Sequence, residues 1–204
     1  MRVFSQQRPS AKHDHVDVIF GNKITVRFTD PRRFGALFYS TNWQQHPLLI
    51  NLAPEPLSEY FHPQYHMAKL CKTNRVIKQV LMDAHIVVGV GNIYASEALF
   101  LARINPAKEA SHLSKAEIMA LINAVKTTLQ KAIALGGTTL KDFRQSNGKP
   151  GYFRNELQVY GRKDEPCFVC QQSIQKTTQG QRATYFCPQC QKSAGSVIPR
   201  AGIN

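Results

Sequence analysis

Apolar and polar residues alternate near the start of the chain. Every second position is apolar on either side of a Gly21-Asn22 pair, at Val16, Val18 and Phe20 and then at Ile24, Val26 and Phe28. Strict alternation around a two-residue turn former predicts a β-hairpin over residues 16–28. Short apolar runs at residues 1–4 and 37–39 predict two further strands.

The spacing of apolar residues changes to that of helices in the middle of the chain. Val76, Ile77, Val80 and Leu81 lie on one face of a first predicted helix. Residues 93–102 form a second helical segment. Its expected N-cap is Asn92, because a short amide side chain readily accepts from the free N–H groups of a first turn.

A third predicted helix has the clearest boundaries. Ser114 and Glu117 form a capping box at its start, and Gly136-Gly137 closes its C-terminus. Between them, apolar residues recur at helical spacing, at Ile118, Leu121, Ile122, Val125, Leu129 and Ile133. Residues 145–152 lack such periodicity and are rich in turn formers, so we expect a mobile surface loop of the kind that often carries function.

Four cysteines near the C-terminus have the spacing of a metal site. Cys167 and Cys170 form one Cys-x2-Cys pair, and Cys187 and Cys190 form a second pair sixteen residues later. Four thiolates suit a tetrahedral ion and leave no open coordination position. The pattern therefore predicts one structural zinc ion.

The residues between the two cysteine pairs predict a zinc hairpin. Residues 182–186 have the composition of a strand leading into the second pair, which places Arg182 near the turn. The fifth cysteine, Cys71, has no partner pattern around it, so we expect a buried or bystander thiol rather than a nucleophile. We expect no disulfides, because neither a secretory signal nor a bilayer-spanning apolar run is present.

The chain is strongly basic along its whole length. It has 204 residues, with 26 Lys and Arg against 13 Asp and Glu, a net charge of +13 and a pI near 9.8. The net charge is +3 over residues 1–55, +6 over 56–150 and +4 over 151–204. Such an excess favours a polyanionic partner, most simply nucleic acid, over a generically basic protein.

Three short segments are candidates for binding nucleic acid. The turn that ends in Gly91 and Asn92 would expose N–H groups at a helix start, which suits a phosphate, although such a turn is often only a turn. Residues 30–35 combine two arginines with a phenylalanine on a turn, which suits phosphate pairing and insertion into a base stack. The alternative is a surface turn with a core-facing Phe34. The triplet at residues 13–15 lacks a third metal ligand nearby, so we favour a phosphate contact by His13 or no role.

Taken together, these motifs resemble the bacterial formamidopyrimidine-DNA glycosylase family. Residues 88–100 resemble its helix–two-turn–helix segment, and residues 12–17 and 30–35 are similar to its DNA-contacting strand and intercalation loop. Residues 136–143 and 148–153 are similar to its lesion-covering loop region, and residues 156–162 with the four cysteines to its zinc finger. The similarity runs from about residue 12 to residue 192 in the family's order. It favours this family over the related one that acts on oxidised pyrimidines.

The resemblance implies an enzyme of base-excision repair. Such an enzyme flips 8-oxoguanine or a formamidopyrimidine out of double-stranded DNA, removes it as a glycosylase and cleaves the abasic site as a lyase by β,δ-elimination. Arg182 is implied in DNA binding and in δ-elimination, Arg32 and Phe34 in filling the gap, and Lys78 and Asn92 in holding phosphates. The full set of implied DNA-binding residues is His13, Arg32, Arg33, Phe34, Lys78, Gly91, Asn92, Lys141, Tyr152 and Arg182. A bacterial cytoplasmic monomer, associated with the nucleoid through DNA, is also implied.

The start of the chain departs from the family's pattern. The family's nucleophile is an N-terminal proline, followed by glutamate, whose amine attacks the sugar C1′. A lysine in the same first domain assists β-elimination. The second residue here is Arg2. We therefore expect that segment to lie upstream of Met1, and we expect the apolar residues at 16, 18 and 20 to be uncovered.

The predicted fold is α+β and multidomain. Residues 1–55 are expected to form the C-terminal half of a catalytic β-sandwich, since a whole sandwich takes about 100 residues. Residues 56–153 are expected to form the helix–two-turn–helix domain with the lesion loop. A β-hairpin zinc finger over residues 154–192 and a tail over 193–204 follow.

Two functions fit these observations. The first is an ordinary glycosylase and AP lyase whose start is truncated or misassigned in the given chain. The second is a zinc-dependent DNA-binding protein without excision activity. For the chain as it stands we expect no borohydride-trapped adduct on 8-oxoguanine DNA, but salt-sensitive binding to abasic or bent DNA. A zinc-ribbon protein acting on RNA or the ribosome fits the charge and the cysteines but not residues 30–35.

Overall fold

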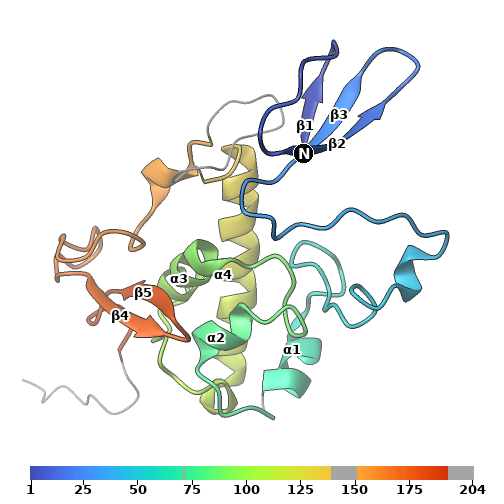
Figure 1. The fold of residues 1–204 in the computed structure, drawn as a ribbon. Helices are drawn as coiled ribbons and strands as arrows, with labels where there is room; N and C mark the ends of the chain where they lie inside the picture. The colour runs from blue at the N-terminus through green and yellow to red at the C-terminus, as the bar shows by residue number, and fades with distance from the viewer. Residues whose placement is uncertain (71, 139–150, 193–204) are drawn as a thin grey trace, which may run out of the picture. The chain divides into compact units, whose positions relative to one another are not determined.

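The computed structural model describes residues 1–70, 72–138 and 151–192. Its described residues have the predicted α+β fold class, and they divide into two compact units (Figure 1). One unit contains Met1–Leu49 and Ala132–Glu156, and the other contains Ile50–Lys131 and the chain from Leu157 onward. Of the predicted loop at 145–152, residues 145–150 lie outside the described residues. The predicted tail at 193–204 also lies outside them.

The N-terminal strands form a three-stranded antiparallel sheet in the order β1-β3-β2. These strands are β1 (Arg2–Phe4), β2 (Asp14–Ile19) and β3 (Thr25–Thr29). The hairpin of β2 and β3 is confirmed, but its turn contains Lys23 as well as the predicted glycine and asparagine. Lys23 adopts a left-handed φ of 64°, and its N–H donates to the Phe20 carbonyl at 2.9 Å.

The prediction of a strand at residues 37–39 is wrong. The structure has no regular secondary structure there and places the 3₁₀ helix η1 (Trp43–Gln45) shortly afterwards. An apolar run becomes a strand only when a neighbouring strand offers its backbone groups. The described sheet ends at β1 and β2, and neither pairs with this segment.

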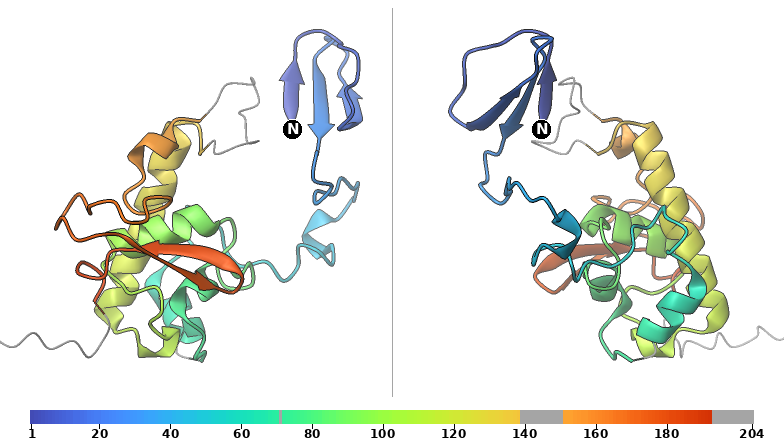
Figure 2. Two further views of the ribbon diagram at one scale, coloured as in Figure 1. Left: turned by 60° about the vertical axis from the view of Figure 1, so that its left-hand side comes forward. Right: turned by 90° about the vertical axis from the view of Figure 1, so that its right-hand side faces the viewer.

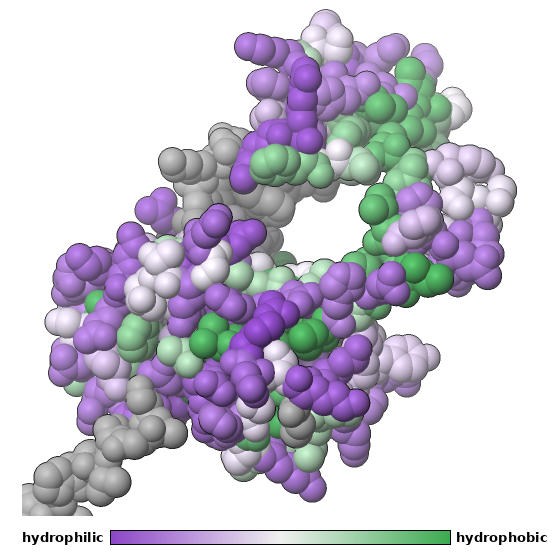
Figure 3. Space-filling view, turned by 60° about the horizontal axis from the view of Figure 1, so that its bottom comes forward, coloured by the Kyte–Doolittle hydropathy of each residue, from purple (hydrophilic) through white to green (hydrophobic). Residues whose placement is uncertain are grey.

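The two faces of the sheet differ sharply in chemistry. On one face Arg27, 3% exposed, donates to the carboxylates of Asp14 and Asp17 and to the carbonyls of Arg8 and Pro9, at 2.6 to 3.0 Å. The other face is apolar and open, as predicted for residues 16, 18 and 20. Figure 3 shows hydrophobic surface on this unit, to which Val3, Val16, Val18 and Phe20 contribute with exposures between 40 and 52%.

The second unit has a helical core. Its helices are α1 (Pro63–Leu70), α2 (Ile77–Leu81), α3 (Asn92–Leu101) and the N-terminal part of α4 (Lys115–Ala134), with the 3₁₀ turn η2 (Ala110–His112). Helix α3 is central, since all its residues from 95 to 100 are buried. The predicted capping box of α4 is confirmed, because Ser114 and Glu117 each donate a backbone N–H to the other's side chain, at 2.8 and 3.2 Å. Gly136 and Gly137 end this helix with φ values of 73° and 88°.

The C-terminal hairpin lies against α3. Strands β4 (Gln175–Gln179) and β5 (Arg182–Phe186) pair antiparallel, so the predicted strand at 182–186 is confirmed (Figure 2). Gly180 and Gln181 form the turn with positive φ values, which puts Arg182 beside it. Phe100 of α3 packs in one cluster with Val159, Ile174 and the buried cysteines. The 3₁₀ helix η3 (Phe153–Glu156) comes before the zinc hairpin in sequence and belongs to the unit that contains the N-terminal sheet.

None of the helices in the described ranges is both long enough and apolar enough to cross a membrane.

Packing around α3 yields a stability prediction. Leu99→Ala should lower the free energy of unfolding by about 3 kcal/mol, because Leu99 is 0% exposed and its removal leaves a cavity. Leu101→Ala on the same helix is the matched control, since Leu101 is 53% exposed and should change stability by less than about 0.5 kcal/mol. Urea unfolding followed by circular dichroism measures both, and equal effects would contradict this packing.

Candidate metal centre and nucleic-acid interface

The four predicted zinc ligands meet in one place. Their sulfur atoms all lie within 4.8 Å of one another, with individual separations of 3.4, 3.5 and 3.9 Å. A tetrahedral zinc ion with Zn–S bonds of about 2.3 Å requires sulfurs about 3.8 Å apart. The observed spacing fits that requirement, so the cluster is a site for one zinc ion.

Ionisation of all four thiols together would need a neighbouring cation. Burial, together with the neighbouring sulfurs, raises the pKa of the Cys187 and Cys190 thiols above the usual value. Thiolates packed this closely repel one another, and a divalent ion removes that repulsion. A zinc ion at this site would cross-link the two Cys-x2-Cys pairs and have no open coordination position for catalysis.

A buried glutamine ties the zinc hairpin to the helical core. Gln191 is 0% exposed, and its side chain accepts from the Cys187 N–H and donates to the Ile104 carbonyl, at 2.9 and 2.8 Å. Its own carbonyl accepts from the Asn105 side chain at 2.9 Å. The second cysteine pair is therefore held against the segment that follows α3.

A buried lysine joins three parts of the second unit. Lys78 on α2 is 0% exposed, and its ammonium group donates to Asn92 Oδ1 at 2.6 Å, Thr184 Oγ1 at 2.8 Å and the Ala183 carbonyl at 3.0 Å. Asn92 Nδ2 donates to that same carbonyl at 3.0 Å and to the Tyr160 hydroxyl at 3.3 Å. The structure thus brings together the predicted residues Lys78 and Asn92 and the strand that carries Arg182.

The role predicted for Asn92 as an N-cap is wrong. Gly91 occupies the N-cap position with an extended backbone, and Asn92 is the first residue of α3. The Asn92 side chain is instead engaged with Lys78, Ala183 and Tyr160. No side chain caps the helix, and the positive end of its dipole at this start favours an anion.

A single carboxylate secures the segment leading into the zinc module. Glu97 is 4% exposed and accepts three backbone N–H groups, from Gln158, Val159 and Tyr160, at 2.8 to 3.0 Å. Burial raises the pKa of Glu97, and these three hydrogen bonds oppose the rise. Glu97 thereby fixes the position of Tyr160, which contacts Asn92. Sequence reasoning missed this residue, although a lone acid within an apolar helix is a usable signal.

The turn at residues 30–35 is preorganised by its own aspartate. Asp30 accepts the N–H groups of Arg32 and Arg33 at one oxygen and that of Gly35 at the other, at 2.6 to 3.1 Å. Phe34 is 82% exposed, and the Arg32 guanidinium lies 5.0 Å from its ring centroid. Of the two readings, the structure therefore favours an exposed Phe34 over a core-facing one.

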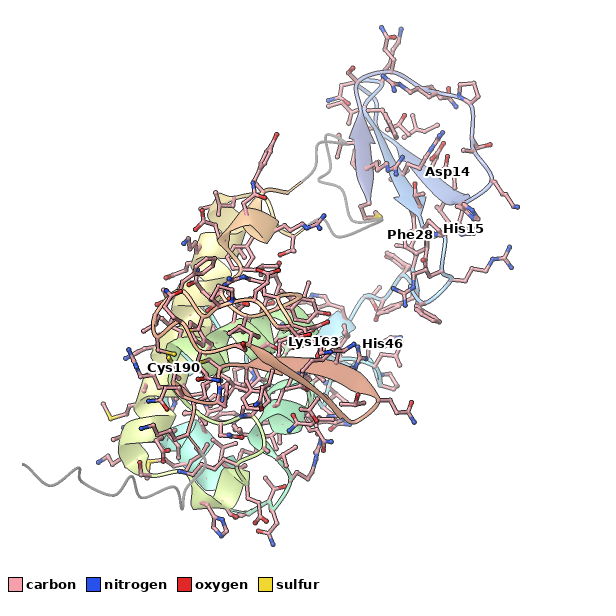
Figure 4. All side chains as sticks on the ribbon, turned by 90° about the vertical axis from the view of Figure 1, so that its left-hand side faces the viewer. Asp14, His15, Phe28, His46, Lys163 and Cys190 are labelled. Atoms are coloured by element: carbon pink, nitrogen blue, oxygen red, sulfur yellow. The ribbon has the colours of Figure 1, made fainter. Side chains whose placement is uncertain are left out.

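The histidine segment supports the same turn. His15 Nε2 lies 3.0 Å from the Asp30 carbonyl oxygen, and the Asp30 N–H donates to the His13 carbonyl at 3.0 Å. Figure 4 shows His15 beside Phe28 on the sheet, with ring centroids 6.1 Å apart. His15 is thus occupied within the unit, and His13 stays half-buried next to the turn.

Two predicted residues are not brought into these clusters. Tyr152 is 57% exposed at the end of the glycine-rich segment, where its N–H donates to the Leu135 carbonyl at 2.9 Å. Lys141 lies outside the described residues.

Zinc removal provides a first test of the site. The purified protein should contain one zinc per chain, and chelation or Cys170→Ser should lower the melting temperature by several degrees, because the hairpin loses its cross-link. Cys71→Ser is the control and should retain the metal. Elemental analysis with thermal unfolding measures both, and unchanged zinc in the Cys170→Ser variant would contradict the four-cysteine site.

Glu97→Gln provides a second test. Glutamine keeps the shape but offers one accepting oxygen to three N–H groups, so it should cost about 2 kcal/mol of stability. It should also increase hydrogen exchange at residues 158–160. Glu109→Gln, at a more exposed position, is the control. Protection of residues 158–160 equal to wild type would show that Glu97 does not hold this segment.

Two family models match the chain. One, described as the formamidopyrimidine-DNA glycosylase H2TH domain, matches residues 52–144. The other, described as a zinc finger found in FPG and IleRS, matches residues 164–192 and so includes all four cysteines.

Named relatives extend the match to most of the chain. Formamidopyrimidine-DNA glycosylase of Klebsiella pneumoniae is 52% identical over 192 residues, which cover 94% of this chain and 71% of the relative. The structure of MutM (FPG) from Thermus thermophilus is similar with a TM-score of 0.81 at 38% identity, over 94% of this chain and 73% of that one. Lactococcus lactis Fpg in complex with abasic-site DNA gives a TM-score of 0.82 at 37% identity, over 94% and 71%. The chain therefore belongs to the formamidopyrimidine-DNA glycosylase family.

Proposed function

We propose that this protein acts in base-excision repair on double-stranded DNA that contains an oxidised purine or an abasic site. One observation carries the proposal: Asn92 at the uncapped start of α3 is hydrogen-bonded to the zinc hairpin at Ala183, beside Arg182. The positive end of a helix dipole and a permanently charged guanidinium both favour phosphate. The Lactococcus lactis relative in complex with abasic-site DNA supports the same partner.

The remaining contacts divide into backbone and base-stack roles. From the second unit, Gly91, Asn92 and Arg182 would serve the phosphates, and the buried Lys78 would favour them through its positive charge. Further DNA contacts would be His13, Arg33, Lys141 and Tyr152. Arg32 and Phe34 would fill the gap left by a flipped lesion, because an exposed ring next to a guanidinium can stack on bases and pair with phosphate. The net charge of +13 supports salt-sensitive binding to the DNA duplex.

The proposed reaction is that of a glycosylase and AP lyase. It removes 8-oxoguanine or a formamidopyrimidine and then cleaves the abasic site by β,δ-elimination, with Arg182 serving the δ-elimination step. Family membership at 52% identity supports this chemistry. We also propose that the protein works as a monomer at the nucleoid of a bacterial cytoplasm, with the domain boundaries 1–55, 56–153 and 154–192.

Phe34 gives the sharpest test of damaged-DNA recognition. The wild type should bind an abasic-site duplex at least about tenfold more tightly than an undamaged one, and Phe34→Ala should remove most of that preference. Its stability should not change, since the ring is 82% exposed. Tyr39→Ala is the matched control, because Tyr39 is a 91% exposed aromatic of the same unit.

Fluorescence anisotropy at two salt concentrations measures these affinities. Equal wild-type affinity for damaged and undamaged duplexes would overturn the proposed recognition. The chemistry is tested separately, by incubating the protein with an 8-oxoguanine duplex and measuring base release and strand cleavage. For the chain as it stands, whose second residue is Arg2, we expect selective binding without base release. Base release would contradict that expectation and favour the first function, an ordinary glycosylase and AP lyase.

A further inference from the structure

We propose that Thr184 is a positioning residue for DNA binding, which acts by holding the Lys78 ammonium group and, through it, Asn92 and the strand of Arg182. The effect on DNA binding rests on the proposed function, but the contacts from which it is inferred lie wholly within the second unit. Thr184 is 0% exposed in the middle of β5, where a side chain cannot touch DNA itself.

The Thr184 hydroxyl accepts a hydrogen bond from Lys78 and directs its own proton elsewhere. Its proton has two acceptors away from Lys78, Gln179 Oε1 at 3.4 Å and the Arg182 carbonyl oxygen at 3.5 Å. The oxygen's lone pairs are then free for the Lys78 ammonium, which donates to them at 2.8 Å. With the Asn92 and Ala183 oxygens, Thr184 supplies the third of three acceptors for the three ammonium N–H groups.

All three acceptors are neutral. Within the described ranges no carboxylate pairs with Lys78, and the charge that acts on it is that of the like-charged Arg182 of β5. Burial, followed by the Arg182 charge, lowers the pKa of Lys78 from 10.5 to about 8. The charged form therefore depends on each hydrogen bond that the ammonium donates, and the loss of one acceptor destabilises it further.

The Lys78 ammonium sets the orientation of Asn92. Because Lys78 can only donate, it selects the Asn92 rotamer that presents Oδ1 to it. Nδ2 must then face the Ala183 carbonyl and the Tyr160 hydroxyl, as observed. A neutral, displaced Lys78 would remove this preference and free the first residue of α3.

The same ammonium fixes β5 next to Arg182. The Ala183 carbonyl accepts from both Lys78 and Asn92 at 3.0 Å, so two donors hold the peptide group between Ala183 and Thr184, one residue after Arg182. At the hairpin turn, the side chain of Gln79, adjacent to Lys78 on α2, packs against Gly180, where an added Cβ would lie 3.1 Å from Gln79 Nε2. Thr184 thus connects α2, the start of α3 and the hairpin turn.

Thr184→Val tests the proposal because valine keeps the branched shape and the strand preference while removing the hydroxyl. Thr184→Ser restores the hydroxyl. Thr177→Val is the matched control, since Thr177 pairs with Thr184 across the hairpin but is exposed. Each variant should bind one zinc, which elemental analysis checks before binding is measured.

The first measurement is the pKa of Lys78 in the absence of DNA. The Lys78 side chain, labelled at Cε and titrated by NMR, should show a pKa near 8 in the wild type, in Thr184→Ser and in Thr177→Val. Thr184→Val should titrate at lower pH. A Thr184→Val protein that titrates like the wild type would overturn the link between the two residues, whatever the protein does with DNA.

The second readout is affinity for an abasic-site duplex at fixed salt, from about pH 6.5 to 9.5. Thr184→Val should bind roughly tenfold more weakly near neutral pH, with the alkaline loss of binding moved to lower pH. Thr184→Ser should stay within about twofold of wild type. Affinity and a pH profile equal to wild type would overturn the positioning role.

A double-mutant cycle separates positioning from mere packing. If Thr184 acts through Lys78, Thr184→Val should weaken binding little further in a Lys78→Met background. Additive losses would overturn the proposal. A wild type that fails to prefer the abasic duplex would instead refute the proposed function, and the NMR titration would still decide whether Thr184 holds Lys78.

Discussion

The second unit depends on one buried positive charge. The Lys78 ammonium has three hydrogen-bond acceptors and no carboxylate partner among the described residues, which is a costly arrangement for a globular core. An acid beside it would stabilise the free protein but would also neutralise the site at which a phosphate is proposed to bind. The observed arrangement keeps the positive charge unneutralised, while neutral groups from α3 and β5 accept its three N–H groups. The relative position of helix and hairpin is therefore part of the proposed binding site.

Three other interactions keep that arrangement rigid. The zinc cluster closes the hairpin, Gln191 anchors its second cysteine pair to the Ile104 carbonyl, and Glu97 holds the segment that carries Tyr160. Each connects segments more than 15 residues apart in sequence, and each satisfies buried polar groups that would otherwise cost stability. The zinc would therefore contribute to the proposed DNA binding indirectly, by fixing where β5 lies.

Much of the local structure could be predicted from the residues. Alternation at 16–28 predicted the hairpin, the Ser114 and Glu117 pair predicted the start of α4, and two Cys-x2-Cys pairs predicted the metal centre. These features depend on neighbours in sequence, which is why short-range rules find them. The strand expected at 37–39 and the N-cap expected at Asn92 were wrong, because strand pairing and the use of the Asn92 amide depend on distant partners.

The sequence by itself determined the metal ligands, the helix boundaries near Ser114 and the resemblance that led to the family. Only the tertiary structure decided that Lys78 is buried, that Glu97 accepts three backbone N–H groups and that Thr184 faces a lysine over 100 positions away. The physical reason is that the hydrogen bonds of a buried polar side chain must be met wherever the fold supplies partners. Residue spacing does not encode those partners, whereas a tetrahedral thiolate site or a capping box is nearly complete within a short segment.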